Sequence, residues 1–137
     1  MSGETNLAKL LASMRPSIAP DVYVFATLPS ATPIPASIAP LMTFRESEGT
    51  TLILTETQAK SAGLAAIFPS RMITLDVHSS LEAVGFIAAI ATRLAAAGIG
   101  VNPVAGYFHD HLFVPIDRAD EALEILAAIS ANALPPP

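Results

Sequence analysis

Alternation of apolar and polar residues is one of the signals that predict strands in this chain. It is clearest in residues 71–78, where Ile73 and Leu75 alternate with Thr74 and Asp76. A period of two places successive side chains on opposite faces of a sheet, so this segment is predicted to bury one face and expose a polar one. The other predicted strands are residues 21–28, a pair within 41–54 around a Glu-Ser-Glu-Gly turn, and a second pair formed by "IGVNPVAGYF" and "LFVPI" around the turn that carries His109 and His111.

A three- and four-residue period predicts a long helix over residues 80–97. Ser79 and Glu82 have the spacing of a capping box at its start, and Gly98 is placed to end it. This helix is predicted to bury one stripe of apolar side chains, namely Leu81, Val84, Ala88, Ala91 and Leu94.

Weaker signals predict three further helices. One covers residues 6–14, a second follows the Thr55–Gln58 capping box and ends near Gly63, and the third follows Asp117 as its cap. The last helix is expected to bury Ala119, Ala122, Leu126 and Ile129. Residues 29–40 contain prolines throughout and are therefore predicted to be an extended connection.

An internal repeat organises these elements. Residues 42–55 align with residues 104–117 at a shift of 62 without a gap. The order strand, helix, strand, strand, helix is that of the ferredoxin-like unit. We therefore expect an α+β fold of two ferredoxin-like modules side by side, with helices on one face of an antiparallel sheet. The predicted modules are residues 1–67, a degenerate copy without the first helix, and residues 68–137; each should need a strand of the other, which makes them one compact unit.

The composition of the chain limits the kinds of partner that we expect. Apolar residues make up 52% of the 137 residues and charged residues 14%, against about 25% in typical proteins, so we expect burial against a second copy in a homodimer. The seven Lys and Arg residues are scattered and the net charge is −5, which argues against nucleic acid. The chain has no cysteine, no basic start typical of a signal peptide and no apolar run long enough for a bilayer, so we expect a cytoplasmic protein without a membrane partner.

Three sequence runs carry a resemblance to a known family. "VHSSLEAVG" and "YFHDHLFVP" lie in a segment that resembles the C-terminal module of small bacterial proteins with two ACT domains, and "MTFRESEGTTLIL" is similar to the hairpin of their N-terminal module. The resemblance implies a non-catalytic regulatory protein that binds a small ligand, an amino acid above all, and needs no cofactor. Many ACT domains carry Asp-x-Pro-Gly after the first strand, whereas this chain has His-Ser-Ser-Leu at residues 78–81, so the ligand pose of those relatives does not transfer.

A candidate ligand site follows from the predicted topology. The end of the strand at His78 should lie beside the hairpin of His109 and His111, at the positive N-terminal end of the predicted helix, which favours a carboxylate. We predict that an amino acid binds there with its carboxylate at residues 79–81 and its amine near Asn102. The predicted ligand-binding residues are His78, Ser79, Ser80, Leu81, Val84, Gly85, Asn102, His109 and His111.

Other interpretations stay open at this point. The serines could serve only as helix caps and Gly85 only to relieve packing. The three histidines, with Asp76 or Asp110, could bind zinc, but a hairpin tip splays its side chains and no second shell is evident, so no metal is predicted. A homodimeric interaction module without a small ligand is the remaining alternative, and no catalytic residue is predicted.

Overall fold

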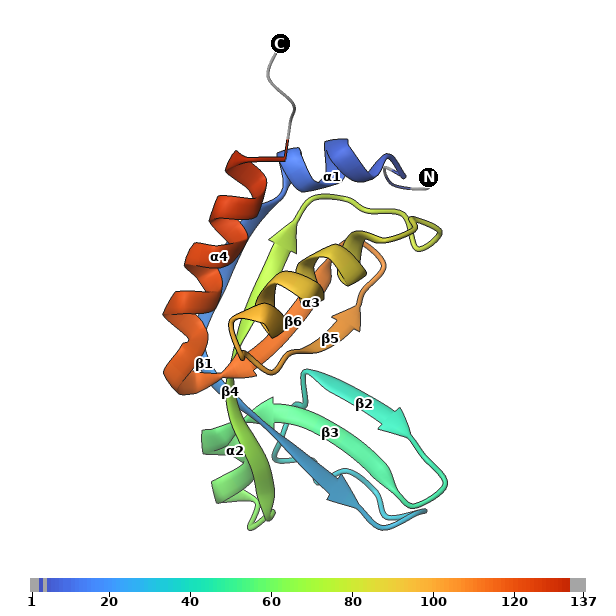
Figure 1. The fold of residues 1–137 in the computed structure, drawn as a ribbon. Coiled ribbons are helices and arrows are strands. Elements are labelled where there is room, and N and C mark those ends of the chain that lie inside the picture. The colour runs from blue at the N-terminus through green and yellow to red at the C-terminus, as the bar shows by residue number, and fades with distance from the viewer. Residues whose placement is uncertain (1–2, 4, 134–137) are drawn as a thin grey trace. The chain divides into compact units, whose positions relative to one another are not determined.

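The computed structural model describes residue 3 and residues 5–133 (Figure 1). The elements are α1 (Leu7–Ser13), β1 (Arg15–Leu28), β2 (Met42–Arg45), β3 (Thr50–Thr55), α2 (Glu56–Ser61), β4 (Ala66–Asp76), α3 (Phe86–Ala96), β5 (Asn102–Ala105), β6 (Asp110–Pro115), the 3-10 turn η1 (Ile116–Arg118) and α4 (Ala119–Ala131). Over the described residues the strand order is β2-β3-β1-β4-β6-β5. The predicted α+β class with an antiparallel sheet is confirmed. No helix within this part of the chain is both long and apolar enough to cross a bilayer.

The chain divides into two compact units. Unit 1 consists of residues 1–19 and 71–137, and unit 2 consists of residues 20–70. Two long strands, β1 and β4, pass from one unit to the other. The predicted module boundary after residue 67 falls inside β4 and stays a prediction.

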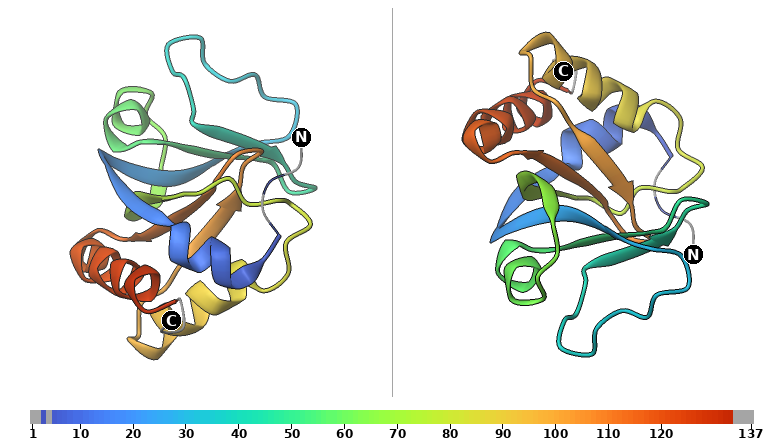
Figure 2. Two further views of the ribbon diagram at one scale, coloured as in Figure 1. Left: turned by 90° about the horizontal axis from the view of Figure 1, so that it is seen from above. Right: turned by 90° about the horizontal axis from the view of Figure 1, so that it is seen from below.

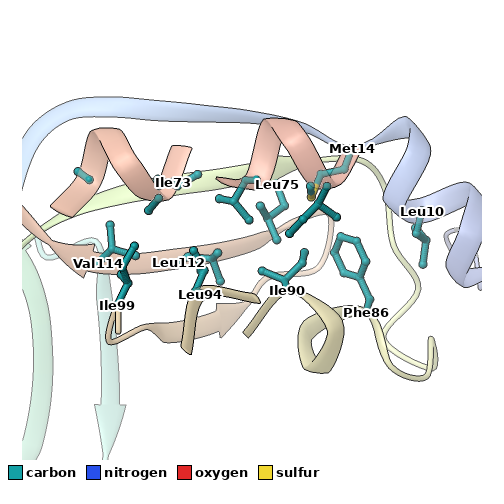
Figure 3. Packing of buried hydrophobic residues seen from close by; sticks show 14 residues of the cluster. Leu10, Met14, Ile73, Leu75, Phe86, Ile90, Leu94, Ile99, Leu112 and Val114 are labelled. Carbon is teal, nitrogen blue, oxygen red and sulfur yellow. The ribbon is translucent and has the colours of Figure 1, made fainter. Parts of the chain in front are cut away.

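Unit 1 packs its three helices over one face of its strands (Figure 2). The core between the two layers consists of apolar side chains, mainly from β4 and β6 on one side and from the helices on the other (Figure 3). Leu10 and Met14, from the N-terminal segment, are fully buried in it. The labelled members of this core are Leu10, Met14, Ile73, Leu75, Phe86, Ile90, Leu94, Ile99, Leu112 and Val114.

Helix α3 begins later than the sequence pattern predicts. Its first residue is Phe86 and its N-cap is Gly85, so the predicted start at residue 80 is wrong. The Ser79 hydroxyl donates to a carboxylate oxygen of Asp110, and the Ser80 hydroxyl accepts from the Glu82 amide within a turn. A tertiary partner and a local turn therefore occupy the hydroxyl groups that the pattern assigned to a helix cap.

The later start also changes which side chains α3 buries. Phe86, Ile90 and Leu94 form the buried stripe, whereas Leu81 and Val84 are 69% and 84% exposed. Of the stripe predicted from the sequence, only Leu94 is fully buried, because residues 81 and 84 precede the helix and residues 88 and 91 lie off its core-facing side. The predicted end is correct, since Gly98 adopts a φ of +74° directly after the C-cap.

Helix α4 buries the predicted stripe of Ala119, Ala122, Leu126 and Ile129. Its predicted cap is wrong, because Asp117 lies in η1 and no side chain caps the helix. Arg118 at this end donates to the Ala97 carbonyl oxygen and pairs with Glu121 at 2.8 Å.

Unit 2 contains the β2–β3 hairpin, with β3 paired to β1 and α2 following β3. Thr55 caps α2 by accepting from the Gln58 amide, as predicted. The Gln58 side chain accepts from the Ala39 amide instead of closing the capping box. This bond secures the proline-rich residues 29–40, which contain no helix, as the sequence predicted.

The two hairpins repeat each other with the same register. Met42 pairs with Ile53 as Asn102 pairs with Phe113, and Arg45 pairs with Thr50 as Ala105 pairs with Asp110. Equivalent residues are thus 60 apart, so the repeat is present but the predicted shift of 62 is wrong by two. Because side chains alternate with a period of two, this error keeps every residue on the correct face and is not detectable from hydrophobicity alone.

Candidate functional site

The candidate site lies at one end of unit 1, where the loop of residues 77–85 meets the β5–β6 turn of residues 106–109. The His109 ring joins the two, with Nδ1 3.2 Å from the Val77 carbonyl oxygen, which requires the proton to be on Nδ1. A second link is the 3.1 Å hydrogen bond from Ser79 Oγ to Asp110 Oδ2. The end of the strand near His78 and the histidine hairpin therefore meet in the way the topology argument proposed.

A hollow of about 230 Å³ opens beside the first turn of α3, and we call it the helix hollow. Its walls are the loop, the start of the helix and the beginning of β6. The lining residues are Ser79, Ser80, Leu81, Ala83, Gly85, Phe86, Ile87, Ala88, Ala105 and Asp110. The amide groups of the first helical turn have no carbonyl partner within a helix and α3 has no side-chain cap, so this wall carries the positive end of the helix dipole.

Asp110 supplies the opposite charge in the same hollow. Its side chain lies on the helix-facing side of β6, in alternation with Leu112 and Val114, and the residue is only 9% exposed. Its hydrogen bond with Ser79 satisfies one oxygen and leaves further acceptor capacity. The sequence interpretation overlooked Asp110 as a contact for an amino acid, although its period-two spacing placed it on the same strand face as Leu112 and Val114.

Gly85 is required by its backbone conformation. Its φ of +88° lies in the left-handed region, and an added Cβ would meet only Leu7 Cδ2, at 3.6 Å. Space is therefore available, and the residue turns the chain sharply into the helix. Packing relief does not explain this glycine.

A second hollow, of about 220 Å³, adjoins the first, and we call it the aromatic hollow. Residues 79–81 line both hollows. The aromatic hollow adds Gly3, His78, Glu82 and Tyr107 to its lining. The Tyr107 and Phe108 rings form an edge-to-face pair at 4.8 Å, and His78 lies 5.5 Å from Phe108.

The N-terminal segment lies against this loop. A Cβ on Gly3 would be 2.4 Å from the His78 carbonyl oxygen and 2.8 Å from the Ser80 amide nitrogen. Such contacts are too short for any side chain, so only glycine permits this approach. Nothing in the local sequence pattern indicated it.

Four residues predicted for the site line neither hollow. Val84 points to solvent, and Asn102 is exposed at the opposite end of β5 from Ala105. His109 has Nε2 3.7 Å from Asp76 Oδ1, and His111 has Nδ1 3.0 Å from Thr74 Oγ1. His109 supports the loop of residues 77–85 through its hydrogen bond to the Val77 carbonyl oxygen. His111 lies on the face of the sheet opposite to the core.

The electrostatics of His111 follow from its position. Burial lowers the pKa of this imidazole, the nearby His109 lowers it further, and Asp110 acts in the opposite direction. Among residues 3 and 5–133, no three His, Asp or Glu side chains are arranged to hold a metal ion.

The fold and the sequence together define the family of this chain. An ACT-domain family model matches residues 2–71, and a second, different ACT-domain model matches residues 67–128. The chain belongs to the ACT-domain family and contains two such domains in tandem, as its resemblance implied. No curated protein is significantly similar to this chain.

Several solved structures share this fold. A Vibrio cholerae protein of unknown function, described as a "possible transport protein", is 46% identical to this chain, with a TM-score of 0.82. The match covers 90% of this chain and 95% of the Vibrio chain. An Agrobacterium tumefaciens protein is 17% identical, with a TM-score of 0.73 and coverage of 85% and 89%. The regulatory subunit of aspartate kinase from Thermus flavus is 10% identical, with a TM-score of 0.60 and coverage of 94% and 99%, and it shares the fold.

Proposed function

We propose that this tandem ACT protein is a non-catalytic sensor that binds a free amino acid in the helix hollow. The observation that carries the proposal is the presence of two opposite charges in one small hollow. The first turn of α3 supplies amide groups that have no hydrogen-bond partner among the described residues, and the buried carboxylate of Asp110 lies on another wall. An α-amino acid carries a carboxylate and an ammonium on the same carbon, and therefore needs both.

Each polar group in the hollow has a role in this proposal. The ligand carboxylate accepts hydrogen bonds from the amides of the first turn, where the helix dipole also favours a negative charge. The ligand ammonium donates to Asp110, which replaces Asn102 as the proposed amine contact. Ser79 holds Asp110 in place, and Ser80 and Leu81 also line the hollow.

The regulatory part of the proposal rests on the family. Tandem ACT domains resemble the regulatory subunit of aspartate kinase in fold, which supports a regulatory role. We further propose that the protein acts as a cytoplasmic homodimer and reports ligand occupancy to a partner.

Calorimetric titration with the twenty amino acids tests the proposal. For the tightest amino acid, its α-hydroxy acid and its decarboxylated amine should each bind at least about tenfold more weakly, because each leaves one charged wall unpaired. Asp110→Asn should weaken the amino acid while leaving the α-hydroxy acid nearly unchanged. Equal binding of the amino acid and the hydroxy acid, or no binding of any amino acid, contradicts the proposal. Thermal unfolding of the Asp110→Asn variant checks that it remains folded.

An interaction module is the second candidate, and one observation favours it. Large apolar side chains around the hollows are exposed to solvent, at 69% for Leu81, 84% for Val84, 64% for Tyr107 and 60% for Phe108. Clustered exposed apolar side chains are typical of contact surfaces. Light scattering at rising concentration, combined with the titration, separates the candidates, since a protein that dimerises and binds no amino acid supports this second function.

A further inference from the structure

We infer that the ligand is an amino acid with a basic side chain, an ammonium or guanidinium, and that this side chain occupies the aromatic hollow. The inference rests on the proposed function and names the ligand class for the same site. It starts from the two adjoining hollows, which differ in their chemistry. The helix hollow offers two opposite charges for the backbone of an amino acid, and the aromatic hollow offers a different set of groups for its side chain.

The position of the aromatic hollow makes it the continuation of the helix hollow. Both are lined by residues 79–81, so a ligand held against the first turn of α3 extends over this segment into the aromatic hollow. The chain itself closes one side, because Gly3 lines the aromatic hollow and packs on the backbone of His78. A side chain that crosses Leu81 meets its apolar surface first, which suits an aliphatic stem.

The lining of the aromatic hollow is suited to a cation. Tyr107 presents an aromatic ring, and the negative face of such a ring attracts an ammonium or guanidinium group. Glu82 adds a carboxylate, and within the described residues it forms no ion pair. No Lys or Arg lines the hollow, and residues 72–92 contain none.

The alternatives for the ligand side chain fit less well. An acidic side chain would face Glu82 with a like charge, and like charges repel. An aromatic or aliphatic side chain would cover the Glu82 carboxylate without pairing it, which costs free energy. A basic side chain is the class that both Tyr107 and Glu82 favour.

Matched pairs of ligands test the inference. Lysine is compared with norleucine, and arginine with citrulline, since each pair has similar shape and differs by one positive charge. With the wild-type protein, each cationic ligand should bind about three- to tenfold more tightly than its neutral counterpart. Equal affinities within both pairs overturn the inference and leave the proposed function standing, whereas no binding of any amino acid overturns both.

Two variants assign the effect to residues. Glu82→Gln should remove most of the advantage of the cationic ligands and leave norleucine and citrulline nearly unchanged. Glu124→Gln is the matched control, because Glu124 is an exposed acid on α4 outside both hollows, and it should keep the wild-type advantage. Tyr107→Leu retains apolar area without a ring and should weaken lysine about two- to fivefold relative to norleucine. An unchanged preference for lysine and arginine in Glu82→Gln overturns the inference.

Discussion

At the scale of single residues, two hydrogen bonds decide what the candidate site is made of. The bond from Ser79 to Asp110 holds a carboxylate inside the helix hollow, and the bond from His109 to Val77 fixes the loop beside it. Both join segments more than thirty residues apart, with sequence separations of 31 and 32. Of the predicted histidines, His109 supports the loop and His111 lies on the opposite face of the sheet, whereas Asp110 contributes the negative charge.

His111 makes stability depend on pH. Burial lowers its pKa in the folded protein below the ordinary value near 6.5, so the folded state binds a proton less readily than the unfolded state does. The contribution of the neutral ring to stability is present above about pH 6.5 and is lost as the pH falls through the lowered folded pKa. The charged and polar groups around the ring are His109, Asp110 and Thr74.

We therefore expect His111→Gln to lose less stability than the wild type when the pH falls from 7.5 to 5.5. Urea unfolding of both proteins at several pH values measures this, and comparison at pH 7.5 removes the pH-independent cost of the substitution. Parallel curves for the two proteins over this range would show that His111 is not responsible.

At the scale of elements, the start of each helix depends on which partner its capping side chain finds. Thr55 accepts from the Gln58 amide and begins α2 where the pattern predicts. Ser79 has the same kind of signature, but its hydroxyl is bonded to Asp110 and α3 begins at Phe86 instead. A local motif predicts a cap reliably only when no tertiary partner competes for the same side chain.

Two substitutions at predicted caps should differ in cost. Thr55→Ala removes a hydrogen bond to the first turn of α2 and should lower the free energy of unfolding by about 1 kcal/mol. Asp117→Ala removes no cap and should change it by less than about 0.5 kcal/mol. Chemical denaturation of both variants measures the difference, and an equal cost at the two positions would contradict the assigned helix starts.

At the scale of the whole molecule, the units are not consecutive pieces of the chain. Unit 1 takes α1 and the first residues of β1 from the N-terminus, and Leu10 and Met14 are fully buried in its core. Ser130 of α4 also donates to the Met14 carbonyl oxygen, at 2.9 Å. The second repeat therefore depends on a segment that precedes the first.

A fragment of residues 68–137 should consequently fail to fold on its own. Without Leu10 and Met14 it leaves a cavity in the core and exposes the helix faces that cover it. We expect poor dispersion in its NMR spectrum and no cooperative thermal transition.

A rearranged chain is the control for this fragment. This chain joins residues 71–133 to residues 5–19 through about eight Gly and Ser residues and so restores the missing segment. Because the end of α4 lies beside the end of α1, the linker must run back along α1, which is roughly 10 Å long. A linker of this length spans about 15 Å on average. This chain should unfold cooperatively. Cooperative unfolding of the fragment itself would contradict the dependence on the N-terminus.

The sequence alone determined the features that depend on local periodicity and on family resemblance. Strand-forming residues on either side of two turns identified both hairpins, and glycine and threonine marked the end of α3 and the start of α2. The "VHSSLEAVG" and "YFHDHLFVP" runs indicated tandem ACT domains, which the family models confirm. These signals are carried by residues within a few positions of one another.

Only the tertiary structure decided the exact repeat shift, the start of α3 and the makeup of the site. A pattern with a period of two does not reveal an error of two residues in the repeat shift. The cap predicted at Ser79 does not form because the serine hydroxyl is bonded to the distant Asp110 carboxylate. The approach of Gly3 to His78 and the burial of Asp110 beside a helix end likewise arise from segments far apart in sequence. Local patterns specify which elements form, whereas long-range packing specifies which of their polar groups meet.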